Sequence, residues 1–301
     1  HSLRRAINVV RDPEVAEFNI ITIPGVTATG VTDYLLDVTE DRGDAIAIID
    51  LEKVYEAQSE NTKSYQNRNS FSISQAVDSL RERGINNSYG ACYYPWVRIQ
   101  DTVSGQALWA PPSVAALGAF SFNDRVRAPW YAPAGFARGG LSEGAGGVPV
   151  LDVSRRLTSD ERDDLYSAGI NPIAQFPAEG IVIFGQKTLQ RTRSALDRIN
   201  VRRLMVFLKK EISFIASRML FDQNTQSTWN RFIGQAEPIL RSVQSRFGLE
   251  EFRLILDEST TTPDLVDRNI IYAKILLKPT RTAEFFAIDF VITNTGASFA
   301  D

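Results

Sequence analysis

A short run of almost unbroken apolar residues constrains the fold of this chain more than any other feature of its sequence. Residues 45–51 read AIAIIDL, a pattern typical of a strand that is buried on both faces of a parallel sheet. A strand pattern at 18–23 precedes this run and another at 89–99 follows it, with helical spacing at 31–40 and 70–83 between them. Strands and helices that alternate at these separations predict an α/β domain with a mixed or parallel sheet.

Further elements of the same kind are predicted as far as residue 190. They are a helix at 70–83 capped by Ser72 or Ser74, a helix at 114–122, a helix at 158–168 with Thr158 and Glu161 in capping-box register, and strands near Ile173 and at 181–184. Six glycines between 135 and 147 lack the order of a nucleotide-binding loop and predict a flexible surface loop. We therefore expect an α/β domain over 18–190, preceded by an extended arm at 1–17 that contributes no core element.

The second half of the sequence is patterned differently, with long amphipathic helices ahead of the strands. A first helix begins near Asn200, and a second ends at Gly248. Strand patterns follow at 252–256, 270–278 and 284–293. This order predicts an α+β C-terminal domain at 191–293, with two long helices and an antiparallel sheet, and a polar tail at 294–301.

Charge and the rarer residue types disfavour several classes of protein. Lys and Arg total 33 against 36 Asp and Glu, and the resulting net charge of −3 argues against affinity of the whole protein for nucleic acid. Cys92 has no partner for a disulfide, and cysteine-rich zinc sites are impossible with one cysteine. The sole histidine is His1, which disfavours histidine-based catalysis. No stretch approaches about 18 consecutive apolar residues, and no signal peptide is visible, so the default location is the cytosol.

Two features permit an enzymatic or nucleotide-binding alternative. Asp50 ends the buried strand, where α/β enzymes carry catalytic or ribose-binding carboxylates, although an acid that caps a loop or pairs with a cation has the same signature. The segment Gly180–Thr188 has the two glycines of a phosphate loop, but Gln186 displaces the lysine and strand-forming residues separate the glycines. No acidic cluster has the spacing of a calcium loop. The sequence therefore predicts no cofactor and no metal.

One segment concentrates positive charge. Residues 187–220 contain nine basic and two acidic side chains. Four of the basic residues share one side of the predicted helix, because each lies seven positions from another: Arg202, Arg203, Lys209 and Lys210. Three interpretations stay open, namely a solvated face, an electrostatic contact with an acidic protein surface, and nucleic-acid binding, which lacks the usual interleaved aromatic residues. We take these four cations as candidate interface residues.

The strand predicted at 284–293 lies close to the end of the chain. Its apolar residues alternate along one face, at Phe286, Ile288, Phe290 and Ile292. Loose terminal segments beside sheet edges can exchange strands between subunits, and fraying of the terminus is the other interpretation. These four residues form the second set of candidate interface residues.

Several segments, taken in order, resemble the contractile tail sheath proteins of phages. They are APPSVAALG at 110–118, DR at 124–125, APAG at 132–135, GINPI at 169–173, GIVIFGQKTL at 180–189 and INVRRL at 199–204. The resemblance extends from roughly residue 18 to 293, and a sheath of the phiKZ-like giant-phage kind is the narrower expectation.

The resemblance implies a structural, non-enzymatic subunit that polymerises around a tail tube and contracts to drive the tube through the host envelope. It implies a subtilisin-like first domain without proteolytic activity, a C-terminal domain that faces the tube, and terminal arms that add strands to a neighbour's sheet. The implied partners are other sheath subunits, the tail tube protein, and baseplate and tail terminator proteins, with no membrane and no direct nucleic acid. The implied location is the virion tail, assembled in the host cytoplasm. Sheath proteins commonly carry more chain ahead of these motifs, so we expect a truncated or protease-resistant fragment.

Overall fold

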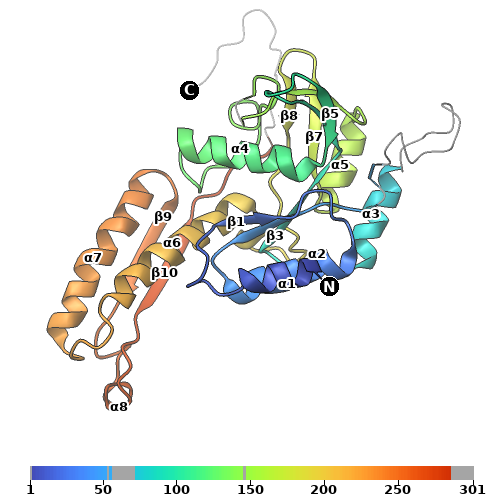
Figure 1. Ribbon diagram of the computed structural model, residues 1–301. Helices are drawn as coiled ribbons and strands as arrows, with labels where there is room; N and C mark the ends of the chain where they lie inside the picture. Colours follow the sequence, from blue (N-terminus) through green and yellow to red (C-terminus); the bar gives the residue numbers. More distant parts are fainter. Residues whose placement is uncertain (1, 53, 56–71, 145–146, 286–301) are drawn as a thin grey trace, which may run out of the picture.

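The structure, a computed structural model, describes residues 2–52, 54–55, 72–144 and 147–285. At its centre lies a five-stranded sheet in the order β1-β2-β3-β7-β8 (Figure 1). Four strands pair in parallel, β1 (Ile20–Thr22), β2 (Ile46–Ile49), β3 (Gly90–Tyr94) and β7 (Asn171–Phe176), and β8 (Gly180–Ile183) is antiparallel to β7. The predicted mixed α/β sheet is confirmed, and the apolar run provides its fully buried second strand.

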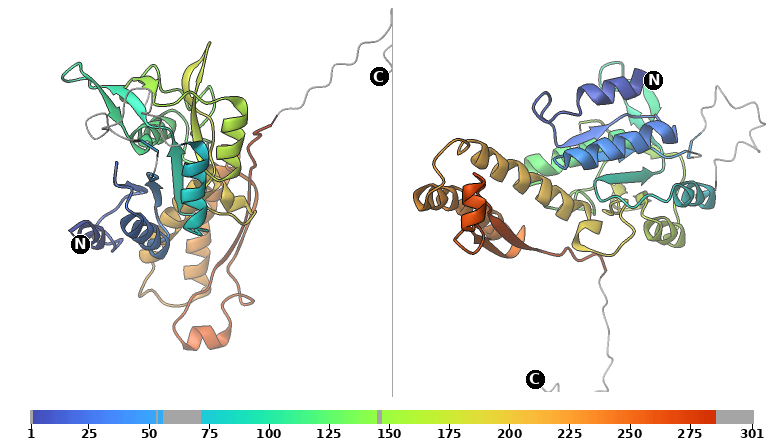
Figure 2. Two further views of the ribbon diagram at one scale, coloured as in Figure 1. Left: turned by 90° about the vertical axis from the view of Figure 1, so that its right-hand side faces the viewer. Right: turned by 90° about the horizontal axis from the view of Figure 1, so that it is seen from below.

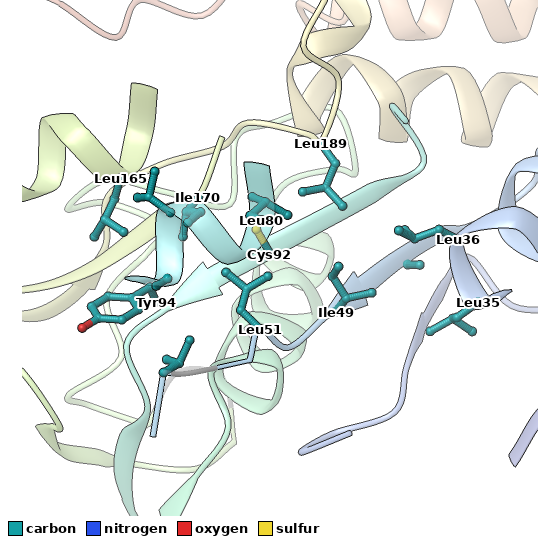
Figure 3. Close-up of a cluster of buried hydrophobic side chains, with 14 of the residues drawn as sticks. Leu35, Leu36, Ile49, Leu51, Leu80, Cys92, Tyr94, Leu165, Ile170 and Leu189 are labelled. Carbon is teal, nitrogen blue, oxygen red and sulfur yellow. The ribbon is translucent and has the colours of Figure 1, made fainter. Parts of the chain in front are cut away.

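Both faces of this sheet are covered by helices. Ile46 and Ile48 of β2 pack beneath α4 (Pro112–Val126), whereas Ala47 and Ile49 face the opposite helical layer. That layer contains α1 (Ser2–Val9), α2 (Thr29–Arg42), α3 (Ile73–Glu82) and α5 (Ser159–Ser167). Figure 3 shows the cluster in which Ile49 meets side chains of these helices. Because alternate residues of a strand point to opposite faces, a strand covered on both sides is apolar throughout.

The strand expected as one unit at 89–99 is divided between two sheets. The chain leaves β3 at Pro95, which has no N–H for a ladder hydrogen bond, and resumes as β4 (Val97–Gln100). β4 is the middle strand of a separate antiparallel sheet with β5 (Ala107–Ala110) and β6 (Val150–Val153). The prediction of a single strand was therefore wrong at the proline.

The N-terminal segment is not the extended arm that the sequence predicted. Helix α1 lies on α2, and the side chain of Ile7 is buried in the core below it. Arg42, the last residue of α2, donates to the carbonyl oxygen of Ala16 at 2.9 Å and pairs with Asp44 at 2.8 Å. Arg42 thus fastens the end of this segment through contacts that no local sequence pattern reveals.

The first part of the glycine-rich segment at 135–147 is bound to the sheet, although a free surface loop was expected. Gly139 accepts from the N–H of Ile183 at 2.8 Å, and Gly140 forms an isolated bridge with Val182 along the outer edge of β8. A Cβ atom on Gly139 would stand 2.6 Å from the carbonyl oxygen of Ile183. Glycine at this position therefore allows two backbones to approach closely.

The C-terminal part combines helices with a hairpin and projects from the central sheet (Figure 2). Helices α6 (Ile199–Ser217) and α7 (Gln226–Ser245) pack together and against β9 (Leu249–Ile255) and β10 (Lys274–Pro279), which are antiparallel, with α8 (Pro263–Asp267) between them. The predicted α+β character of this region is confirmed. The strand predicted at 284–293 falls outside the described residues from Phe286 onward.

Two glycine-to-alanine substitutions with opposite expected effects test this packing. Gly139→Ala should lower the free energy of unfolding by about 1–3 kcal/mol, because its Cβ has no room against the backbone of β8. Gly234 lies inside α7, and apart from its neighbours and the backbone of its own helix no atom of the described residues stands within 4 Å of the place that a Cβ atom would take. Gly234→Ala should therefore raise that free energy by up to about 1 kcal/mol. Urea titration of the two variants measures both changes. Effects of the same sign would contradict this packing.

Candidate subunit interface

The basic residues of α6 contact the first half of the chain, and of the four only Lys209 is also exposed. Lys209 donates from Nζ to the carbonyl oxygen of Arg42 at 3.1 Å, and Lys210 donates to that of Phe18 at 2.7 Å. The first of these acceptors is at the C-terminal end of α2, where helix carbonyls lack partners and favour a cation. Both lysines therefore bind backbone oxygens of the first domain.

The two arginines on the same side of α6 are buried in that contact. Arg202 is 6 % exposed, and its guanidinium lies 3.9 Å from the ring centroid of Tyr89. Arg203 is 3 % exposed, lies over the ring of Phe120 at 4.9 Å and pairs with Asp124 at 2.5 Å. Burial lowers the pKa of Arg202. Stacking on aromatic faces suits the planar, weakly hydrated guanidinium and offsets part of its desolvation.

The sequence thus identified these four cations as a group but not what they contact. Arg203 meets Asp124 across 79 residues, and the two lysines meet their acceptors across 167 and 192 residues. Helical spacing places side chains on a common side of a helix, and says nothing about which part of the chain covers that side. All four are occupied by groups of their own chain.

The other predicted set, Phe286, Ile288, Phe290 and Ile292, lies outside the described residues. The structure does show how the chain approaches this strand, because residues 280–285 leave β10 and return to the first domain. Glu284 accepts from Arg198 through both carboxylate oxygens, at 2.6 and 3.0 Å, and from Gln186 at 3.2 Å. This bidentate pair fixes the chain at the first residue of the predicted strand, two positions ahead of Phe286.

The returning segment borders a broad hollow of about 1370 Å³ that the sequence did not reveal. Residues of α3, α5, the 187–201 segment and the 279–285 segment line it. Its basic side chains outnumber its acidic ones: Arg81, Lys187, Arg191, Arg193, Arg198 and Arg281 stand against Asp163, Asp197 and Glu284. No sequence signal marks this site, because Arg198 and Glu284 are 86 residues apart.

The contacts of Asp50 are those of an acid that caps loops, as in the structural interpretation given above. Its side chain is 1 % exposed, and Oδ2 accepts from the N–H of Gly25 at 2.8 Å and from the hydroxyl of Ser113 at 2.7 Å. Oδ1 accepts from the N–H of Ser113 at 3.2 Å. Burial raises the pKa of Asp50, and these hydrogen bonds oppose the increase. The carboxylate joins the end of β2 to the first turn of α4, and the enzymatic alternative gains no support.

The segment Gly180–Thr188 does not form a phosphate cradle. Its first residues are β8, paired with β7, and the N–H of Lys187 donates to the side chain of Asn171 at 2.6 Å. Among the residues that the structure describes, no cluster of His, Cys, Asp or Glu could hold a metal ion. No helix in the described part is long and apolar enough to cross a membrane.

Sequence comparison finds two family matches in the same order as the two halves of the chain. Residues 5–189 match the phage tail sheath protein central domain, and residues 192–293 match the phage tail sheath C-terminal domain. The tail sheath protein of Vibrio phage KVP40 is 36% identical over 75% of this chain, and that of Enterobacteria phage T4 is 32% identical over 64%. The chain spans 32% and 28% of the length of these two curated relatives.

Solved structures show the same fold. A chain of the anti-feeding prophage baseplate has a TM-score of 0.73 at 21% identity, with 97% of this chain and 72% of that chain covered. A chain of the sheath complex of an extracellular contractile injection system, in its contracted state, has a TM-score of 0.73 at 21% identity over 95% and 74% of the two chains. With family matches over most of its length, the chain belongs to the phage tail sheath protein family.

Proposed function

We propose that this chain is part of a structural subunit of a contractile tail sheath, which polymerises around the tail tube and contracts to drive the tube through the host envelope. The observation that carries this proposal is the ordered match of 5–189 and 192–293 to the two sheath domains. The curated relatives are themselves tail sheath proteins. The proposed partners are other sheath subunits, the tail tube protein, and baseplate and terminator proteins, in a virion tail assembled in the host cytoplasm.

The proposed mechanism is a change of packing between subunits rather than catalysis. Energy stored in the extended assembly is released when subunits rotate and gain contacts with one another, so neither a nucleotide nor a metal is required. We place the two domains of the subunit at 18–190 and 191–293, and the α6 cations join them, so that each subunit moves as one unit. The bidentate hold of Arg198 on Glu284 supports a fixed exit for the strand that is exchanged.

Two finer points stay predictions. The first domain is expected to be subtilisin-like in its arrangement. The second is a direct electrostatic contact between a partner and the four cations of α6, Arg202, Arg203, Lys209 and Lys210. Their contacts within the chain favour a narrower role. In that role the four cations act on assembly by holding the two halves of each subunit in a fixed relation.

Electron microscopy of the full-length protein, expressed alone, tests the proposed function. Striated cylinders of self-assembled protein are the expected result. Calorimetry with ATP and dinucleotides, with an esterase and peptidase screen, addresses the enzymatic alternative in parallel. Saturable nucleotide binding, or turnover that Asp50→Asn abolishes, would overturn the structural assignment.

Arg203→Met tests the joint between the two halves. The variant keeps an apolar stem but leaves the carboxylate of Asp124 without its buried partner, so the free energy of unfolding should fall by about 2 kcal/mol or more. Arg241→Met is the control, because Arg241 forms an exposed pair with Glu237 in α7 and its loss should cost at most about 0.5 kcal/mol. Denaturant titration measures the free energy of unfolding of both variants. Similar losses in the two would show that the contact of Arg203 with Asp124 does not hold the two halves together.

Ile288→Ser tests strand exchange through the C-terminal strand. If its alternating face packs in a neighbouring subunit, losing one buried isoleucine should raise the protein concentration needed for assembly by about tenfold or more. Val291→Ser is the matched control, because Val291 lies on the opposite face of the same predicted strand. Sedimentation of assembled protein measures both. Equal effects of the two variants would argue against a one-sided strand contact.

A further inference from the structure

Phe247 holds a backbone conformation that phenylalanine rarely adopts. Its φ is 59°, in the left-handed region, directly after α7. The N–H of Phe247 donates to the carbonyl oxygen of Gln244 at 3.1 Å, and that of Gly248 donates to Val243 at 2.9 Å, the hydrogen bonds of a Schellman helix ending. Glycine usually occupies the left-handed position of this motif, because a side chain there costs about 1–2 kcal/mol.

The ring of Phe247 gains little from its own chain in return for this strain. Its side chain is 74 % exposed, and the glycine stands one position later, at Gly248. A large apolar side chain that is both strained and left in water is a feature that a covering surface would explain. The expected cover is an assembly partner.

Basic residues occupy the two helix ends that meet at Phe247. Arg246 donates from Nη2 to the carbonyl oxygen of Arg127 at 2.8 Å, which brings the end of α4 beside the end of α7. We define the Phe247 surface as the exposed residues of these two helix ends: Arg125, Val126, Arg127, Arg246 and Phe247. Among the described residues, no carboxylate pairs with any of its three arginines. The acids nearest in sequence, Asp124 and Glu250, are paired with Arg203 and Lys278.

An exposed apolar side chain on the same helix ends as three arginines without a carboxylate partner fits a partner surface that carries both apolar and acidic groups. The chain itself carries negatively charged side chains of this kind on α5. Asp160, Asp163 and Asp164 are exposed there, and none of the three forms an ion pair within the described residues. Figure 1 shows α5 across the central sheet from the end of α7.

We propose that the Phe247 surface binds the acidic face of α5 on a second copy of this chain. Two different surfaces on opposite sides of one molecule make a head-to-tail contact, which repeats from copy to copy in a ring or a helix. The inference rests on the proposed function, because it requires that copies of the chain assemble. It assigns the contact to a surface separate from the C-terminal strand.

Phe247→Asn is the first test, since asparagine tolerates the left-handed conformation and removes the ring. The midpoint of thermal unfolding of the dispersed protein should rise by about 2–4 °C, while the concentration needed for assembly should rise by about tenfold. Phe221→Asn tests whether strain and exposure alone are enough: Phe221 is also fully exposed, with a φ of 68°, but it lies at the other end of α7 and outside the Phe247 surface with its three arginines. It should raise the unfolding midpoint without a comparable loss of assembly.

Charge reversal identifies the partner. Arg125→Glu with Arg127→Glu, or Asp163→Lys with Asp164→Lys, should each weaken assembly by about tenfold or more, and the four substitutions together should restore most of it. Arg5→Glu is the control for net charge, because Arg5 is exposed on α1, away from both surfaces.

The outcomes separate the two proposals. If the wild-type protein assembles and Phe247→Asn assembles equally well, the role of the Phe247 surface is wrong and the proposed function is unaffected. If the arginine substitutions weaken assembly but the α5 substitutions do not, the partner is another acidic protein and not α5 of a second copy. A wild-type full-length protein that stays dispersed at every concentration would count against the proposed function and remove this inference with it.

Discussion

The contact between α6 and the first half of the chain is the constraint on which the rest of the structure depends. Two arginines are buried there, and removing guanidinium groups from water is costly unless their partners are well placed. The rings of Tyr89 and Phe120 and the carboxylate of Asp124 provide those partners. The opposite side of α6 packs with α7 and the β9–β10 hairpin. One helix therefore belongs to both halves, and its displacement would expose buried charge on one side and apolar core on the other.

Features with short-range causes could be read from the sequence. The apolar run at 45–51 became the doubly buried β2, and the predicted caps at Ser72 and Thr158 are both complete capping boxes. Each depends on residues within a few positions, so spacing alone contains the information. The prediction failed where distant residues decide. The end of the N-terminal segment is held by Arg42 from α2, and the glycines near 139 lie on an edge strand from a later part of the chain.

The candidate site shows the same division. Charge spacing correctly grouped the cations of α6 on one side, but an amphipathic helix has the same sequence whether its charged side meets solvent, a partner or its own chain. The Arg198–Glu284 pair was out of reach for the same reason, since its members lie 86 residues apart and neither stands in a recognisable motif. The strand expected at 284–293 rests on a period of two, which needs no tertiary information, and it stays a prediction.

The two groups of arginines in this chain differ in how completely the chain itself satisfies them. Arg202 and Arg203 are buried against aromatic rings, with a carboxylate beside Arg203, so the chain itself supplies their partners. Arg125 and Arg127 are exposed at the helix end that adjoins the one carrying the strained, exposed Phe247, and they have no ion-pair partner among the described residues. Natural sequences depart from local preferences mainly where function requires it. A subunit that is complete only within an assembly must leave some surface unsatisfied, and the end of α7 has the chemistry expected of such a surface.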